Sequence, residues 1–101
     1  MFFAKYRINN REECGLYYDY EQFHRDTFSP DYEPITFIVF SVHGKDYQSR
    51  KESVRSVAID WSNADVEGIS YSELQCVGLW FEKQGLRYGL IREFSENGLC
   101  R

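Results

Sequence analysis

Five side chains of this 101-residue chain could attack a substrate or hold a metal: Cys14, Cys76, Cys100, His24 and His43. A catalytic cysteine needs surroundings that lower its pKa, and a zinc site needs ligands at close, regular spacing. The sequence has no Cys-x-x-Cys or His-x-x-x-His pair, and no Gly-x-Ser-x-Gly, Walker or dinucleotide-binding motif. We therefore expect no catalytic residue, no metal and no cofactor.

A second kind of chemistry, recognition of another protein, is indicated by GLYYDYEQFHRDTFSPDYE, residues 15–33. Its aromatic rings alternate with carboxylates. Exposed tyrosines supply rigid contact area in protein interfaces, and acidic neighbours attract a basic partner. The alternative is a strand with one wet face followed by a solvated loop. The predicted binding residues are Tyr17, Tyr18, Asp19, Tyr20 and Glu21.

A third kind of site is a helix-turn-helix, with two helices that meet near Gly85. That motif needs a small residue four positions before the turn glycine, where this chain has Phe81. The segment that would read DNA contains Arg87 and Arg92, but two glutamates cancel their charge. Nucleic-acid binding is therefore disfavoured, and Arg87 and Arg92 are its predicted contacts.

The one locally basic stretch, residues 44–55, contains Lys45, Arg50, Lys51 and Arg55. On a helix, Lys51 and Arg55 share a face. Such a face is usually solvated. Alternatively, it contacts the acidic N-terminal region of a second copy and forms a dimer with complementary charges.

The composition is that of one small domain over residues 1–101. Hydrophobic residues make up 43% and aromatic residues 18% of the chain, which is enough for a core without disulfides. The net charge is −4, and residues 1–34 carry seven Asp/Glu against four Lys/Arg, so attraction to phosphate backbones is not favoured. Three cysteines without close spacing and the lack of a long apolar run predict a cytoplasmic protein without a membrane contact.

The N-terminal third has the pattern of strands. MFFAKYRI, residues 1–8, alternates like a half-buried strand, and NNREE predicts a turn. CGLYYDY, residues 14–20, predicts a second strand, with a helix from Tyr20 to Arg25 as the alternative. SPDYEP predicts a loop because it holds both prolines.

The segment ITFIVFSVH, residues 35–43, is the strongest strand signal in the chain. Both of its faces are apolar, a pattern typical of a strand that is covered on both sides. We therefore expect it to be the central strand of the sheet, ending at Gly44.

Two helices are predicted from capping-box spacing. Ser49 and Glu52 precede apolar residues at helical spacing, which predicts a helix over residues 50–62, although a strand over 57–61 would also alternate. Ser70 and Glu73 form the second box, which predicts a helix that begins near Tyr71.

The segment FEKQGLRYGLIREFSENGL, residues 81–99, repeats Phe-x-x-x-Gly-Leu. When a glycine ends a helix in the left-handed conformation, the residue after it often folds back onto the side chain that lies four positions before the glycine. We therefore predict helix ends near Gln84 and Asn97, with a final helix over residues 86–94 between them. The alternation of Leu86, Tyr88 and Leu90 leaves a strand as the alternative.

These elements predict an α+β fold, in which a small two- or three-stranded, mainly antiparallel sheet in the N-terminal half is covered by two or three C-terminal helices. Size and charge suggest a non-catalytic protein-binding or regulatory module of the immunity, antitoxin or inhibitor kind, which binds another protein or itself. The alternatives are a nucleic-acid-binding protein and a small-ligand or catalytic domain with an aromatic pocket. The residues predicted to pack on the sheet are Trp61, Leu74, Val77, Phe81, Leu90, Ile91 and Phe94.

Overall fold

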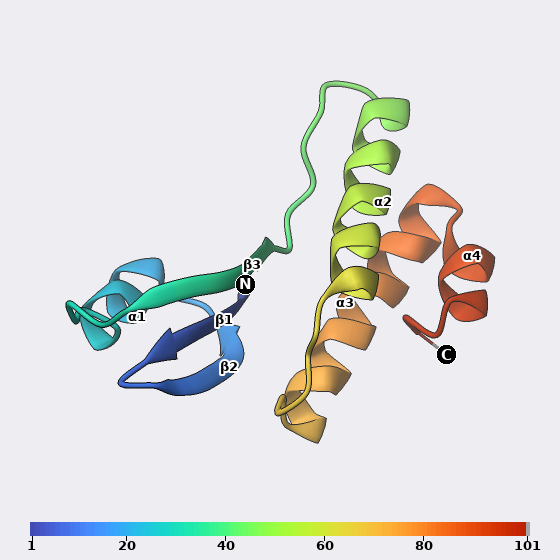
Figure 1. Cartoon of the computed structure of the whole chain (residues 1–101). Helices are drawn as coiled ribbons and strands as arrows, with labels where there is room; N and C mark the ends of the chain where they lie inside the picture. The colour runs from blue at the N-terminus through green and yellow to red at the C-terminus, as the bar shows by residue number, and fades with distance from the viewer. Residues whose placement is uncertain (101) are drawn as a thin grey trace.

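The computed structural model describes residues 1–100 and has the predicted α+β class. Its antiparallel sheet lies in the N-terminal half, and most of its helices follow the sheet (Figure 1). In chain order the elements are β1 (Phe2–Ile8), β2 (Arg11–Tyr17), α1 (Tyr20–Asp26), β3 (Glu33–Val39), α2 (Tyr47–Asn63), α3 (Tyr71–Tyr88) and α4 (Ile91–Glu96).

The N-terminal strand β1 is the middle strand, because the sheet order is β2-β1-β3 and both neighbours are antiparallel to it. Asn9 and Asn10, with φ of 52° and 63°, make the tight turn to β2. Phe2 is 6% exposed and Phe3 is fully buried, although they point to opposite faces of the sheet. The predicted half-buried strand is therefore buried on both faces.

The prediction that residues 35–43 form the central strand is wrong in position and in length. The strand is β3, from Glu33 to Val39, and it lies at the edge of the sheet. Its even-numbered residue Ile38 is buried, whereas Phe37 and Val39 are 47% and 48% exposed. The run of apolar residues on both faces therefore does not mean that both faces are covered. In β3 one apolar face is buried and the other is exposed.

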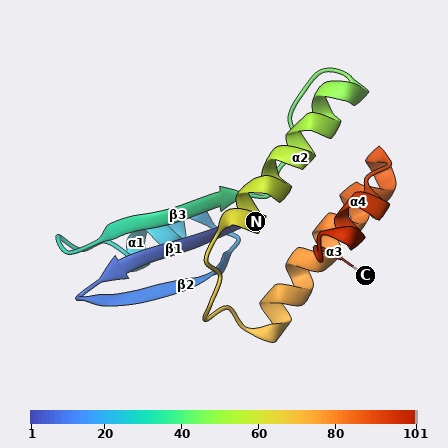
Figure 2. The same ribbon diagram turned by 45° about the vertical axis from the view of Figure 1, so that its right-hand side comes forward.

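The two faces of β1 belong to two separate cores. Phe3 enters the larger core, where its ring meets Trp61 of α2 edge-on at 5.2 Å. Phe2 and Tyr6 enter a smaller core beneath α1, where both contact Phe23. Figure 2 shows α1 lying across that face of the sheet. The alternative helix from Tyr20 is thus confirmed.

Helices α2, α3 and α4 lie beside one end of the sheet, which makes the molecule long and thin, with extents of 43 × 29 × 19 Å (Figure 1). Of the residues predicted to pack there, Leu74 is wrong, because it is 44% exposed. Ile91 is half-buried. The buried ones are Trp61, Val77, Phe81, Leu90 and Phe94.

Helix α2 is confirmed, but its predicted start is wrong. Asp46 is the N-cap and accepts a hydrogen bond from the Ser49 N–H at 2.8 Å. Ser49 therefore stands at the third helical position instead of the cap. Because an aspartate three residues earlier satisfies the first turn, the helix begins before the Ser49–Glu52 pair.

The beginning of α3 is confirmed and its predicted end at Gly85 is wrong. Ser70 and Glu73 make the expected capping box, but the helix continues to Tyr88 and ends on Gly89, with φ of 69°. A Cβ on Gly85 would lie 3.2 Å from both Ile91 Cα and Phe94 Cδ2. Gly85 therefore lets α4 approach α3 closely and does not turn the chain.

The end of the final helix at Asn97 is confirmed, although α4 begins only at Ile91. Gly98 has φ of 72°, and the Leu99 N–H returns to the Phe94 carbonyl at 2.9 Å. This is the fold-back that the repeated Phe-x-x-x-Gly-Leu pattern predicted, and the strand alternative for residues 86–94 is wrong.

Candidate functional site

The predicted tyrosine surface does not form one continuous site. Tyr17 is half-buried in the smaller core, where its ring stacks on Phe2 at 5.7 Å and its hydroxyl lies 3.2 Å from that of Tyr6. Burial raises the pKa of Tyr17, and the hydrogen bond with Tyr6 raises it further. Asp19 is the N-cap of α1 and accepts from the Gln22 N–H at 3.1 Å. These two residues build the fold.

Tyr18, Tyr20 and Glu21 are exposed, but they face different neighbours. Tyr18 is 71% exposed, and a hydrogen bond with the Cys76 thiol of α3 raises its pKa. Tyr20 is 55% exposed. It follows the end of β2 and lies near β3 and not near α3, with its ring centroid 6.2 Å from that of Phe37.

Phe37 of β3, the neighbour of Tyr20, was not among the predicted binding residues. The ring of Phe37 packs against that of Phe2, with centroids 4.9 Å apart, and about half of the residue is exposed. Val39 points to the same face, because side chains two apart along a strand do so. We call Tyr20, Phe37 and Val39 the β3 edge surface.

The backbone of β3 adds hydrogen-bonding groups to this surface. The Phe40 N–H donates to the Met1 carbonyl at 3.1 Å, so Phe40 faces β1. Neighbouring residues of an antiparallel ladder face alternate sides, and Phe37 and Val39 therefore turn their N–H and C=O groups outward. Within residues 1–100, β3 has a neighbouring strand on one side only.

The opposite edge of the sheet, on β2, is covered. Glu73 of α3 accepts the outward Leu16 N–H at 2.7 Å, and the Cys14 thiol lies 3.5 Å from the Glu67 carbonyl. Burial raises the pKa of Glu73, but the hydrogen bonds from Leu16 and Ser70 outweigh it, so the pKa lies below its ordinary value. A charged carboxylate thus closes β2, and β3 remains the open edge among residues 1–100.

The two edges also differ in charge. The strand β2 begins with Arg11, Glu12 and Glu13, and charged residues on an edge strand discourage pairing with another chain. Between Pro34 and Lys45 no charged residue occurs. The sequence held one signal for the position of this strand, because a proline within a strand is tolerated mainly at an edge.

A β-bulge limits the regular part of the β3 edge. The register with β1 shifts between Lys5, opposite Thr36, and Tyr6, opposite Pro34, so Ile35 is the extra residue. A bulge bends a strand and interrupts its ladder. The regular edge that can accept another strand therefore begins at Thr36.

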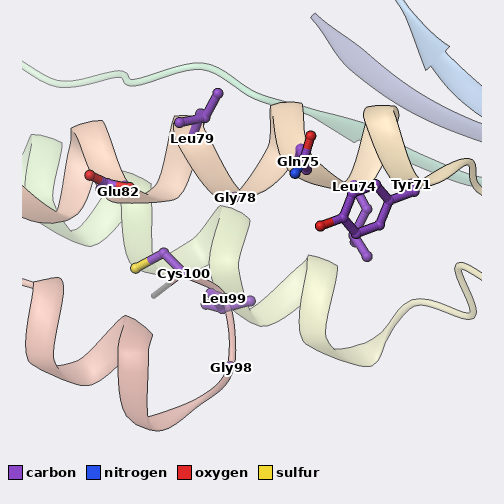
Figure 3. Close-up of a pocket in the computed structure, with 9 residues that line it drawn as sticks. All are labelled: Tyr71, Leu74, Gln75, Gly78, Leu79, Glu82, Gly98, Leu99 and Cys100. Atoms are coloured by element: carbon purple, nitrogen blue, oxygen red, sulfur yellow. The ribbon is translucent and has the colours of Figure 1, made fainter.

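An open groove of about 530 Å³ lies between α3 and the C-terminal segment (Figure 3). Figure 3 shows Tyr71 and Leu74 near one end and Glu82 near the other. Its lining includes a single aromatic ring, one carboxylate and the thiol of Cys100. The groove is thus not the aromatic pocket that a small-ligand function predicts.

The basic side chains considered for nucleic acid or for a dimer lie in the helical half. Arg87 and Arg92 are exposed on α3 and α4. Arg55 pairs with Glu93 at 3.2 Å, and Arg50 donates to the Tyr88 hydroxyl at 2.9 Å. The last two therefore also hold α2 against α3 and α4.

The residues considered for nucleophilic or metal chemistry remain scattered. Cys14, Cys76 and Cys100 are free thiols, and burial raises the pKa of Cys14. Within residues 1–100, no group of three or more His, Cys, Asp or Glu side chains could hold a metal ion. No helix in that range has both the length and the apolar character needed to cross a membrane.

Comparison with models of protein families, with curated proteins and with solved structures finds no match for this chain.

Proposed function

We propose that this protein is a non-catalytic binding module, acting in the cytoplasm, that adds a strand of another protein chain to its β3 edge. The observation that carries the proposal is an open edge strand that has no charged residue after Glu33 and whose exposed face is apolar at Phe37 and Val39, in a sheet whose other edge is closed by Glu73. Exposed hydrophobic edges invite pairing with another chain, and proteins that do not use them cover or charge them.

The chemistry of such binding is known in general terms. Outward backbone groups at Phe37 and Val39 would give affinity, and side chains on alternate positions would give specificity. Tyr20 and Phe37 present two rings that are partly held in place by Phe2. Such rings lose little entropy on binding because packing already restricts them.

The proposal predicts where a bound chain can be trapped. Benzoylphenylalanine, a photo-cross-linking aromatic residue, replaces Phe37 in the chain produced in its own host. The matched control carries it in place of Leu86, which is 67% exposed on α3. We expect a protein adduct at position 37 and none at position 86, identified by mass spectrometry.

A second substitution in the same chain tests whether the edge itself binds. Val39→Lys places a charge on the exposed apolar face beside Phe37 and should abolish the adduct at position 37. Tyr20→Ala should weaken the adduct, whereas Tyr18→Ala, on the other side of the strand end, should not. Equal adducts at positions 37 and 86, or an adduct that survives Val39→Lys, would refute binding at this edge.

A further inference from the structure

We propose that the chain bound at the β3 edge is a second copy of this protein, whose own β3 pairs antiparallel with the first. Each sheet has three strands, so the pair would share one continuous sheet. This inference rests on the proposed function and names its partner. Three features of β3 carry it: the limits of its regular edge, its side-chain pattern and the charge of its flanks.

The regular edge has two definite ends. The bulge at Ile35 bounds it on one side. On the other side, Phe40 makes the last backbone hydrogen bond to Met1, after which residues 41–46 leave the sheet towards the start of α2 (Figure 1). Residues 36–40 are therefore the segment that can pair, and Ile38 is its centre.

A two-fold axis at Ile38 gives complementary contacts. It sets Phe37 of each copy opposite Val39 of the other, so each of these exposed apolar side chains gains an apolar neighbour across the pair. Phe37 and Val39 are the residues whose N–H and C=O point outward, so each such pair can exchange two backbone hydrogen bonds. A large ring thus meets a small side chain, and no charged residue enters the paired segment.

The flanks of β3 carry opposite charges. Residues 26–33 contain Asp26, Asp31 and Glu33 and no Lys or Arg. Residues 41–51 contain three basic residues, Lys45, Arg50 and Lys51, against one aspartate.

Figures 1 and 2 both show residues 41–46 and the start of α2 rising on the open side of β3. Antiparallel pairing therefore brings the acidic flank of each copy next to the basic flank of the other. A parallel pair would put like charges together. The same contact explains how the basic stretch over residues 44–55 could meet the acidic N-terminal region of a second copy.

The first test is the oligomeric state of the purified chain by sedimentation velocity, from about 1 μM to about 1 mM. We expect a dimer that forms with increasing concentration and weakens at high salt, because the flanks attract through solvent. Val39→Lys should weaken dimerisation more than about tenfold. Leu86→Lys, at a residue 67% exposed on α3, is the control and should dimerise like the wild type.

The second test fixes the register and does not depend on the loss of binding alone. Phe37→Glu and Val39→Lys should each be monomeric. When the two variants are mixed, the carboxylate introduced at position 37 of one chain meets the ammonium group introduced at position 39 of the other. The remaining Phe37 then meets the remaining Val39, so a heterodimer should return. A two-fold axis at Phe37 would not restore it. Circular dichroism checks that both variants are folded.

A wild-type chain that remains monomeric at every concentration would overturn the inference. So would a dimer that Leu86→Lys disrupts and Val39→Lys does not, or a mixture that stays monomeric. If the chain is monomeric while position 37 still cross-links to a different protein, the proposed edge function stands and only the identity of the partner is wrong. If position 37 captures nothing in the host and no dimer forms, both proposals fail.

Discussion

Gly85 and Gly78 lie on the same helix, α3, with different surroundings. A Cβ at Gly85 would press on Ile91 and Phe94 at 3.2 Å, whereas one at Gly78 would meet the Leu99 carbonyl oxygen at 3.6 Å, an ordinary contact. Alanine is the better helix former by about 1 kcal/mol. Gly78→Ala should therefore stabilise the protein by about 0.5–1 kcal/mol in urea denaturation.

Gly85→Ala gains the same helix propensity but must displace the backbone of Ile91. We expect it to be less stable than Gly78→Ala by about 1–3 kcal/mol, as for other overpacked sites. Equal gains in the two variants would show that α4 moves away from α3 at little cost, and that the close approach is not what requires glycine.

Tyr17 allows a prediction about alkaline pH. Burial and the bond to Tyr6 raise its pKa, so the protein binds the phenol proton more tightly when folded than when unfolded. This contribution to stability is complete below the unfolded pKa of about 10 and is lost as the pH rises above it. Tyr17→Phe should lose less stability than the wild type between about pH 9 and pH 11.

At neutral pH the same substitution removes one hydrogen bond and should cost about 0.5–1.5 kcal/mol. The measurement is urea denaturation at a series of pH values, with Tyr20→Phe, at a residue 55% exposed, as the control. A Tyr17→Phe variant as sensitive to alkali as the wild type would mean that the phenol is solvated.

One residue type can serve two physical purposes, which limits what a sequence predicts at this scale. Gly98 turns the chain and Gly85 admits a neighbouring helix, yet both precede a leucine and follow a phenylalanine four positions earlier. Tyr17 and Tyr18 are adjacent, but one belongs to the smaller core and the other is 71% exposed. The two glycines differ because α4 packs against Gly85, and the two tyrosines differ because α1 packs against Tyr17.

At the scale of elements, the first turn of α2 gives a direct comparison. Asp46 accepts the Ser49 N–H and is the true N-cap, whereas Glu52 pairs with Arg55 on the surface. Asp46→Ala should cost about 0.5–2 kcal/mol, the usual range for loss of a cap. Glu52→Ala should cost less than about 0.5 kcal/mol, as for an exposed i, i+3 pair.

Thermal unfolding followed by circular dichroism measures both variants. Equal losses, or a larger loss for Glu52→Ala, would contradict the assignment of the cap. Because Asp46 binds Ser49 through its charged form, which lowers the pKa of that carboxyl, the difference between the variants should shrink in acid, where the carboxylate is protonated.

Local signals predicted the elements well and their arrangement poorly. The Ser70–Glu73 capping box placed the start of α3 correctly because a cap involves only residues three apart, whereas the Ser49–Glu52 pair missed the true cap of α2 at Asp46. The place of β3 in the sheet depends on its pairing with β1, far earlier in the chain, which no local pattern contains. The open edge, and with it the candidate binding surface, was therefore missed, although Pro34 pointed to it.

The whole molecule has two cores of unequal size that share β1. Replacing Phe3, which joins the sheet to Trp61, should destabilise the entire chain by about 3–5 kcal/mol in the Phe3→Ala variant. Phe23→Ala empties the smaller core beneath α1. We expect it to speed hydrogen exchange chiefly in α1 and to leave the amides of α3 close to wild type.

Mass spectrometry of deuterium uptake distinguishes the two variants. Phe3→Ala should raise uptake in α1 and α3 alike. If Phe23→Ala also raised uptake in α3 as much as in α1, the two cores would unfold as one unit.

The middle position of β1 has a consequence for synthesis on the ribosome. This strand is made before both of its neighbours, and β2 can pair with it soon after, across Asn9 and Asn10. The other flank, including Phe3, stays open until residues 33–39 have left the exit tunnel. A nascent chain that stalls after β2 and before β3 has been made would expose an incomplete, aggregation-prone sheet. A chaperone would therefore be needed most during this interval.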